Sequence, residues 1–579
     1  MLKTLGAYVK EYKRASIATP FFMILEVLME MLIPYLLSSL IDNGVEKGDM
    51  GYILMVGGCM VVIAMVGLFA GIMGGVYGAK ASTGFAKNLR KGMFDNIQTY
   101  AFSNIDKFST AGLVTRLTTD VTNVQNTYQM LLMCMRAPVS LIFAMIMSFI
   151  ISPRIAFIYL IALVILSCIL AVIIGHATKY FNAAFPKYDE LNASVQENVS
   201  AIRVVKAYVR EDYEKKKFKN ASNNIYRIFV KAEKTVAYNN PVMQITVYTC
   251  ILLISWVGAK MIVGSGGVLL TTGKLMSLLS YCMTILMNLM MVSMIFVMIS
   301  MSVASAKRIA EVLEEKPDIT NPDNPCYEVK DGEIVFEHVN FGYNKGADKR
   351  VLNDINLTIK SGETIGIIGG TGSAKSTLVQ LIPRLYDVTK GNVQVGGVDV
   401  RNYNLEVLRD QVSMVLQKNV LFSGNIYDNI RWGDEHASEE EVRRVCKLAQ
   451  ADGFVSEFPD GYDTMIVQGG NNVSGGQKQR LCIARALLKK PKILILDDST
   501  SAVDTRTDAL IRKAFREEIP NTTKIIIAQR VSSIEDADQI IVLDDGKIAG
   551  VGTSEELLKT NDIYREVYES QVKGGGDDE

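Results

Sequence analysis

The apolar residues of this chain are concentrated before about residue 305, and this uneven distribution constrains the fold more than any other feature. Six apolar segments there are long enough to cross a bilayer, since a transmembrane helix needs about 20 mostly apolar residues. They lie near residues 16–42, 51–80, 128–152, 154–176, 237–263 and 274–303. The sequence therefore predicts an all-α membrane domain of six transmembrane helices embedded in a lipid bilayer.

The connections between these segments differ in length and charge. Segments three and four are separated only by a short turn at Pro153, whereas residues 81–127 and 177–236 are long and rich in lysine and arginine. Basic loops stay on the cytoplasmic side of a membrane. We therefore expect the long loops and both termini in the cytoplasm, and the protein in a cell membrane, the cytoplasmic membrane of a bacterium.

After about residue 330, short β-rich runs alternate with amphipathic helical stretches, which is typical of a soluble α/β domain. The predicted organisation is a transmembrane domain over residues 1–310, a linker over 311–330, the α/β domain over 331–570 and a disordered tail over 571–579. The formal net charge is zero, which gives no indication of a nucleic-acid partner.

A glycine-rich loop follows a predicted buried strand, at residues 364–368, and precedes an apolar helix. The loop consists of Gly369, Gly370, Thr371, Gly372, Ser373, Ala374, Lys375, Ser376 and Thr377. In this strand–loop–helix setting, backbone N–H groups wrap phosphates, a lysine neutralises them, and a hydroxyl binds Mg²⁺. We therefore expect this loop to bind ATP, with Lys375 on the phosphates and Ser376 on Mg²⁺.

Two further residues bear on that site. The strict P-loop pattern has glycine where this chain has Ala374, and a β-carbon at positive φ costs about 1–2 kcal/mol; we expect nucleotide binding to survive. Asp497 ends the apolar run at residues 493–496, where a P-loop ATPase holds its Mg²⁺.

Ser474, Gly475, Gly476 and Gln477 open a later helix. Together with the P-loop and the Asp497 strand in this order, they closely resemble ATP-binding cassette (ABC) transporters, and the resemblance covers essentially the whole chain. Six spans followed by one cassette is the layout of an exporter-type half-transporter, the type IV architecture. The resemblance implies an ATPase-coupled transporter in which these four residues are a signature motif that contacts the ATP bound by a second cassette.

The resemblance also implies roles for three other residues. Tyr343 matches the aromatic residue that stacks on adenine, and Gln417 matches the glutamine that senses Mg²⁺ and the γ-phosphate. Asp504 closes Ser501-Ala502-Val503-Asp504, which matches the loop that crosses the cassette dimer.

Three positions depart from the family pattern around one site. Asp498 replaces the catalytic glutamate, Gln529 replaces the switch histidine, and Gln468 replaces a glutamate before the signature. Because catalysis requires precise placement, a carboxylate shortened by one methylene predicts slow hydrolysis. The pattern resembles the degenerate-site subunit of heterodimeric exporters. It implies a partner half-transporter that has the glutamate and the histidine and uses this chain's intact signature.

Two cytoplasmic stretches, residues 108–120 and 201–211, resemble the family's coupling loops. Each is expected to present a short helix to a cassette groove, and the second loop crosses to the partner's cassette in this fold. The alternative is a solvated charged helix.

Two features of the spans are candidates for a substrate cavity. Methionines on one face of the last span, spaced by three and four residues, suit apolar ligands or, equally, a packing seam between helices. They are Met283, Met287, Met290, Met294, Met298 and Met301. Intramembrane carboxylates usually face the bundle interior or water; we assign Glu26 to the cavity, where it would attract cations. Glu30 is left open, and Arg136 is either a partner for these carboxylates or an interfacial anchor.

The leading interpretation is one subunit of a heterodimeric ATP-driven exporter of small hydrophobic or amphipathic, multidrug-like substrates. The alternatives are an importer with the exporter fold, like siderophore transporters, a lipid or peptide exporter, and a non-transport role as an ATP-gated channel or regulatory subunit.

Overall fold

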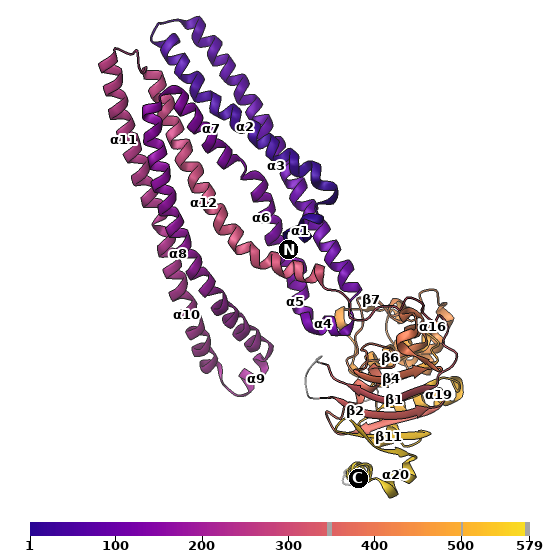
Figure 1. Cartoon of the computed structure of the whole chain (residues 1–579). Coiled ribbons are helices and arrows are strands. Elements are labelled where there is room, and N and C mark those ends of the chain that lie inside the picture. Colours follow the sequence, from indigo (N-terminus) through magenta and orange to yellow (C-terminus); the bar gives the residue numbers. More distant parts are fainter. Residues whose placement is uncertain (344–349, 500–501, 574–579) are drawn as a thin grey trace. The chain divides into compact units, whose positions relative to one another are not determined.

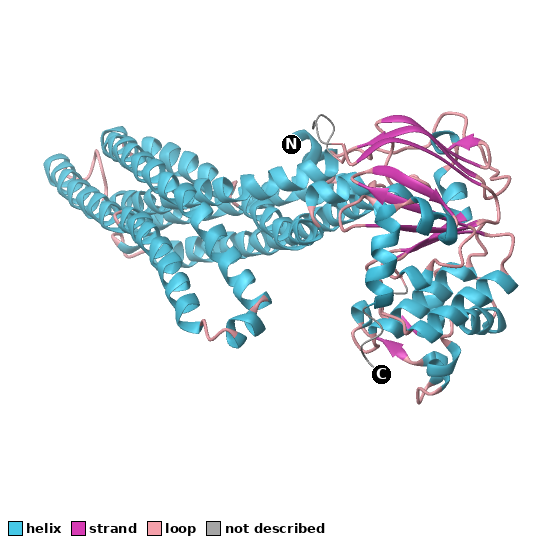
Figure 2. Cartoon of the chain, turned by 90° about the horizontal axis from the view of Figure 1, so that it is seen from below, coloured by secondary structure: helices cyan, strands magenta, loops and turns pink. Residues whose placement is uncertain are grey.

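The computed structural model describes residues 1–343, 350–499 and 502–573, and the chain divides into two compact units. The first unit comprises residues 1–99 and 108–315, and the second comprises residues 100–107 and 316–579. Helices alone make up the first unit, while the strands lie in the second (Figure 2).

The first unit is built from long helices joined by short breaks (Figure 1). The helices numbered before the cassette are α1 (Leu2–Ala7), α2 (Lys13–Leu40), α3 (Met50–Gln98), α4 (Phe102–Phe108), α5 (Thr110–Thr115), α6 (Val121–Met133), α7 (Arg136–Ile151), α8 (Pro153–Ser200), α9 (Ile202–Ala207), α10 (Glu211–Ala237), α11 (Asn239–Ser265) and α12 (Thr272–Glu314). Helix α3 has 49 residues. At 1.5 Å per residue it extends about 70 Å, more than twice the apolar thickness of a bilayer.

Six helical stretches among the described residues are long and apolar enough to cross a membrane, which confirms the predicted number of spans. They are Lys10–Val45, Met50–Gln98, Thr110–Ile151, Pro153–Ser200, Glu211–Ser265 and Thr272–Val292. Buried residues of α2, α7, α8, α11 and α12 form one apolar cluster, in which Tyr159 and Tyr281 donate their hydroxyls to backbone carbonyls. These bonds satisfy hydroxyl groups that are costly to bury unpaired.

The second unit contains a four-stranded antiparallel sheet, in the order β2-β1-β4-β5, and a six-stranded sheet, in the order β12-β11-β3-β10-β9-β6. In the larger sheet β11, β3, β10, β9 and β6 are parallel, and β12 is antiparallel to β11. The strands are β1 (Ile334–Phe341), β2 (Leu352–Ile359), β3 (Thr364–Gly369), β4 (Lys390–Val395), β5 (Val398–Asp399), β6 (Val412–Val415), β7 (Gly424–Asn425), β8 (Met465–Ile466), β9 (Ile493–Asp497), β10 (Thr523–Ile527), β11 (Gln539–Asp544) and β12 (Lys547–Gly552).

Besides α4, the second unit contains helices that follow β3 in the chain. They are α13 (Lys375–Gln380), α14 (Leu405–Gln411), α15 (Ile426–Ile430), α16 (Glu439–Leu448), α17 (Asp452–Ser456), α18 (Gly475–Leu488), α19 (Thr505–Glu518), α20 (Ser554–Thr560) and α21 (Asp562–Lys573). Strand β9 is buried at every residue, because parallel strands are covered on both faces.

Three boundaries differ from the sequence-based expectation. Helix α12 continues to Glu314, so the first part of the expected 311–330 linker is helical. Helix α21 continues to Lys573, so residues 571–573 are helical instead of disordered; residues 574–579 lie outside the described residues. In the first coupling loop, expected at residues 108–120, the short helix that belongs to the second unit is α4, whose residues 102–107 precede that stretch.

Candidate functional site

The candidate site lies at the carboxyl ends of four neighbouring parallel strands. The P-loop follows β3, Gln529 follows β10, Asp497 ends β9 and Gln417 follows β6. Since parallel strands end at the same edge of a sheet, their registers place these four positions side by side; Asp497, for example, pairs with Ile527. Ligands of open α/β sheets bind at such an edge.

The P-loop forms a sharp turn between β3 and α13. Lys375 Nζ donates to the carbonyl oxygens of Gly369, at 2.8 Å, and Gly370, at 2.9 Å, so the ammonium group is held across the loop. Burial lowers the pKa of Lys375, and the nearby Asp498 and Asp497 carboxylates oppose that change. A cation held over backbone N–H groups at a helix start is suited to bind phosphates.

Ala374 adopts the left-handed conformation, with φ of +72° and ψ of +23°, immediately before α13. The residue therefore has the positive φ at which a β-carbon was expected to cost stability. A β-carbon is disfavoured there, which explains why glycine is the usual residue at this point of the motif.

Ser376 and Asp497 provide a pair of oxygen ligands. Ser376 Oγ donates to Asp497 Oδ1 at 2.9 Å, and Asp497 is only 3% exposed. Burial raises the pKa of Asp497, while the Ser376 bond opposes the rise. A hydroxyl and a carboxylate at this distance fit Mg²⁺, which prefers oxygen ligands and relieves the cost of burying a carboxylate.

Asp498 and Gln529, the two residues at substituted catalytic positions, contact each other directly. Gln529 Nε2 donates to Asp498 Oδ2 at 2.7 Å. Asp498 has φ of +50°, and its backbone N–H donates to Ile527 O at 3.1 Å, so its backbone is anchored to β10. The Asp498 carboxylate, which is shorter than that of the usual glutamate, thus accepts a hydrogen bond from the Gln529 side-chain amide, a group that does not titrate.

Gln571 is a further residue at this site that the sequence did not reveal. Its side chain, on α21, donates to Gln529 O at 2.8 Å and accepts from Val531 N at 2.8 Å. It therefore holds the backbone at the carbonyl of the switch position and two residues further along the chain. Gln571 was not identified from the sequence because residue 571 was assigned to a disordered tail. The amphipathic pattern of residues 562–571 could have indicated a helix there.

The signature residues begin α18 in a reciprocal cap. Ser474 Oγ accepts from Gln477 N, and Gln477 Oε1 accepts from Ser474 N, at 3.3 and 2.9 Å. A β-carbon on Gly476 would lie 2.8 Å from Ala502 O, so only glycine lets the following loop approach. Gln479 accepts from Ala502 N at 3.1 Å, and Asp504 caps α19 by accepting from Thr507 N; Ser501 lies outside the described residues. The signature motif and the loop around Ala502 therefore pack directly against each other.

Tyr343, Gln417 and Gln468 are exposed. Tyr343 follows β1, and its hydroxyl lies 2.9 Å from Thr377 Oγ1 of the P-loop. This contact brings an exposed aromatic ring to the same loop that is expected to hold the phosphates.

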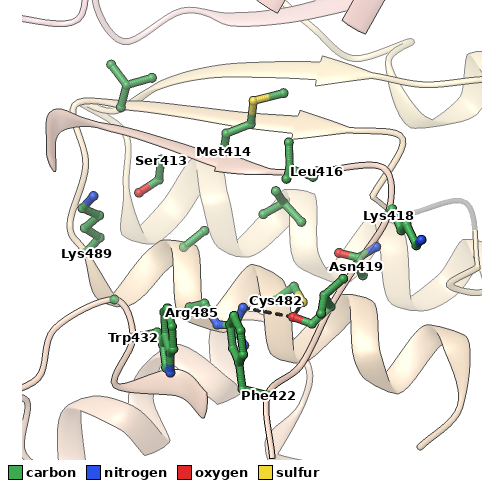
Figure 3. Close-up of a pocket in the computed structure, with 15 residues that line it drawn as sticks. Ser413, Met414, Leu416, Lys418, Asn419, Phe422, Trp432, Cys482, Arg485 and Lys489 are labelled. Carbon is green, nitrogen blue, oxygen red and sulfur yellow. Dashed lines mark hydrogen bonds between the residues drawn. The ribbon is translucent and has the colours of Figure 1, made fainter. Parts of the chain in front are cut away.

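A groove of about 360 Å³ opens beside β6 and α18 (Figure 3). Phe422 stacks on Trp432 with ring centroids 4.1 Å apart, and Arg485 lies over Phe422. Ser413 Oγ and Asn419 Oδ1 are buried without a hydrogen-bond partner among the described residues. Exposed rings beside unpaired polar atoms suit a docked peptide segment.

In the first unit, Arg136 binds both intramembrane glutamates. Its Nη1 lies 2.9 Å from Glu26 Oε1, and its Nη2 lies 2.7 Å from Glu30 Oε2. The Glu26 side chain is 20% exposed and lies against Gly71, whereas Glu30 is 43% exposed. Arg136 is thus a partner for both carboxylates, and the group carries one excess negative charge.

The methionine face of α12 is exposed in this chain. Met283, Met287 and Met294 are 38%, 59% and 64% exposed, while Tyr281 and Ile285 on another face are buried. Met290 and Met298 are intermediate, and the Met301 side chain lies outside the described residues. These three methionines therefore do not form a packing seam within the chain.

The comparisons with known proteins agree with this arrangement. The model of the ABC transporter transmembrane region matches residues 16–310, and the ABC transporter model matches residues 352–501. An uncharacterized ABC transporter ATP-binding protein of Bacillus subtilis, YfiB, is 36% identical, and the alignment covers 98% of each chain. An ATP-dependent lipid A-core flippase of Desulfotalea psychrophila is 31% identical, with 99% of each chain covered.

The fold has a solved counterpart. The structure of a bacterial Atm1-family ABC exporter with ATP bound superposes with a TM-score of 0.83, covers 97% of this chain and 99% of its own, and is 24% identical.

A membrane-spanning helical unit joined to a P-loop ATPase domain defines a half-transporter with the type IV exporter fold. The chain belongs to the ABC transporter family and is an ATPase-coupled transporter.

The left-handed backbone at Ala374 predicts a stabilising substitution. We expect Ala374→Gly to raise the free energy of unfolding by about 0.5–1 kcal/mol, since glycine removes the β-carbon strain at some cost in unfolded-state entropy. Thermal unfolding of the full chain in lipid nanodiscs measures it. The matched control is Ala509→Gly, at an exposed position inside α19, which should destabilise by about 1 kcal/mol. A loss of stability in Ala374→Gly that equals the control would contradict this account.

Proposed function

We propose that the chain is the degenerate-site subunit of a heterodimeric ABC exporter in a bacterial cytoplasmic membrane, with its cassette and termini in the cytoplasm. The observation that carries the proposal is the 2.7 Å hydrogen bond between Gln529 and Asp498. A P-loop ATPase needs a group that orients the attacking water. Here the shortened carboxylate binds an amide instead, so hydrolysis at this site is slow.

The binding residues support retention of nucleotide. Lys375 and the P-loop N–H groups would hold the phosphates of ATP, Ser376 and Asp497 would hold Mg²⁺ with Gln417 beside them, and Tyr343 would stack on adenine. Bound Mg²⁺ would neutralise phosphate charge. This side of the cassette therefore acts as an ATP clamp.

The signature motif of this chain is proposed to serve the ATP site of the partner, not the clamp site. Ser474, Gly475, Gly476 and Gln477 keep an ordered cap that is held against Ala502. This geometry would complete the hydrolytic site of a partner half-transporter that has the catalytic glutamate and the switch histidine, and Asp504 would lie in the dimer loop. The groove beside Trp432 would take the partner's second coupling loop, and α9 would engage the partner's cassette.

The substrate is proposed to be a small hydrophobic or amphipathic molecule, because exposed methionines on α12 suit apolar ligands. The excess negative charge of Glu26, Glu30 and Arg136 favours one that is cationic. The lipid A-core flippase relative makes lipid export the second candidate. Transport direction is tested in inverted vesicles, where uptake driven by ATP supports export and its absence supports the importer alternative.

The asymmetry of the two ATP sites predicts unequal effects of two variants in the complex with the partner. Ser474→Ala is expected to lower steady-state ATP hydrolysis about tenfold or more, because it removes a group from the hydrolytic site. Lys375→Ala is expected to lower it less than about threefold, because it touches only the clamp site.

The control for the first variant is Ser438→Ala. Ser438 caps α16 through the same reciprocal bonding, with Glu441, outside the site. Its activity should match wild type. If Lys375→Ala proves the more damaging of the two site variants, this chain's own P-loop side is the hydrolytic one and the proposal is wrong.

Restoring the family residues should reveal why the clamp is slow. In a complex whose partner has its catalytic glutamate replaced by glutamine, Asp498→Glu alone should raise turnover less than about threefold, since Gln529 still lacks a titratable ring. Asp498→Glu with Gln529→His should raise it further. Single-turnover hydrolysis measures this, and full restoration by Asp498→Glu alone would contradict the role given to Gln529.

The cavity assignment predicts changes in affinity for a lipophilic cation. Glu26→Gln should weaken binding severalfold by removing the excess charge, and so should alanine at Met283, Met287 and Met294 together. Leucine at the same three positions keeps the apolar volume and is the control. Unchanged affinity in the glutamate variant and the alanine triple variant would favour helix packing; binding is measured with labelled cation on nanodiscs.

A further inference from the structure

Four aromatic rings connect the expected adenine site to helix α4 within the second unit. Tyr343 and Phe341 lie with ring centroids 4.9 Å apart, and both contact Tyr386, at 5.2 and 5.7 Å. Tyr386 in turn lies 6.0 Å from the ring of Phe102 on α4. Edge-to-face pairs of this kind contribute about 0.5–1.5 kcal/mol each, so the rings orient one another.

Tyr386 also makes a polar contact with α4. Its hydroxyl donates to Asp106 Oδ2 at 2.8 Å. Burial raises the pKa of Tyr386, and Asp106 raises it further, so the hydroxyl remains a donor at neutral pH.

Other side chains of α4 bind the segment at residues 316–318. Asn104 donates to Lys316 O at 3.0 Å and accepts from Asp318 N, and Ser103 donates to Asp318. These contacts hold α4 against residues 316–318, where the chain enters the second unit again. The bond between Tyr386 and Asp106 joins α4 to the segment after the P-loop helix.

Tyr343 is 48% exposed, so its ring has a free surface on which a base can stack. Stacking of a nucleic-acid base on an aromatic side chain contributes about 1–3 kcal/mol. A base stacked on Tyr343 restricts that ring, and through the edge-to-face contact it restricts Tyr386. Energetic coupling between two sites is carried by chains of packed side chains such as this one.

We propose that Tyr386 is a positioning residue that links occupancy of the adenine site at Tyr343 to helix α4, so that α4 responds to a bound adenine nucleotide whether or not it has a γ-phosphate. The inference rests on the proposed role of Tyr343 in adenine binding. Because ATP and ADP share the base, the two nucleotides have the same effect on α4. A clamp site that keeps its nucleotide would then hold α4 in one arrangement through successive cycles.

The test is hydrogen–deuterium exchange of the full-length chain in lipid nanodiscs, read on peptides covering residues 100–107. Nucleotide binding is measured by titration calorimetry on the same samples. Saturating ATP and ADP should each slow exchange of these peptides about fivefold, whereas inorganic tripolyphosphate, which lacks the base, should leave it unchanged. Slowing by ATP with none by ADP would overturn the inference.

The variant Tyr386→Phe keeps the ring and removes the hydroxyl. It should bind ATP within about twofold of wild type but lose most of the slowing in residues 100–107. Asp106→Ala should have the same effect, and the double variant should add nothing, as expected when both act through one contact. Tyr403→Phe is the control, since Tyr403 donates to Val395 O in the same unit; it should behave like wild type.

Two other results would count against the inference, and they are distinguishable. ATP binding with full slowing in Tyr386→Phe would overturn the role of Tyr386 and leave the proposed function intact. Failure of the wild-type chain to bind ATP at all would overturn the proposed clamp site, and the inference with it.

Discussion

Parallel pairing of β3, β10, β9 and β6 is the constraint on which the nucleotide site depends. It brings the P-loop, Gln529, Asp497 and Gln417 to one edge of the sheet, although they are separated by up to about 160 residues of sequence. The contacts of Ser376 with Asp497 and of Gln529 with Asp498 depend on that register. A one-residue slip would move each side chain to the opposite face.

The sequence predicted most of this arrangement, because each motif combines a local backbone requirement with a chemical one. The six spans follow from hydropathy and the sheet edge from strand–loop–helix patterns. The sequence also indicated that residue 374 could have a positive φ, because the motif normally has glycine there. The Asp498 and Gln529 substitutions were identified by position alone.

The remaining features depend on tertiary contacts that have no local signature. The bond between Gln529 and Asp498 joins residues from different strands, and Gln571 reaches the switch backbone from a helix next to the chain's end. Likewise, the pairing of Arg136 with both glutamates required the packing of α7 on α2. Residues 108–120, which resemble the first coupling loop, lie in the first unit, and the sequence alone did not indicate that residues 100–107 belong to the second unit.

We infer that this chain binds ATP but hydrolyses it slowly when it has no partner. The most direct measurement loads the purified full-length chain with Mg²⁺ and labelled ATP and follows the ratio of ADP to ATP on the protein. We expect stoichiometric binding, with the bound nucleotide remaining ATP over many minutes. Steady hydrolysis at about 1 s⁻¹ or faster, ordinary for an enzyme, by the chain alone would contradict it.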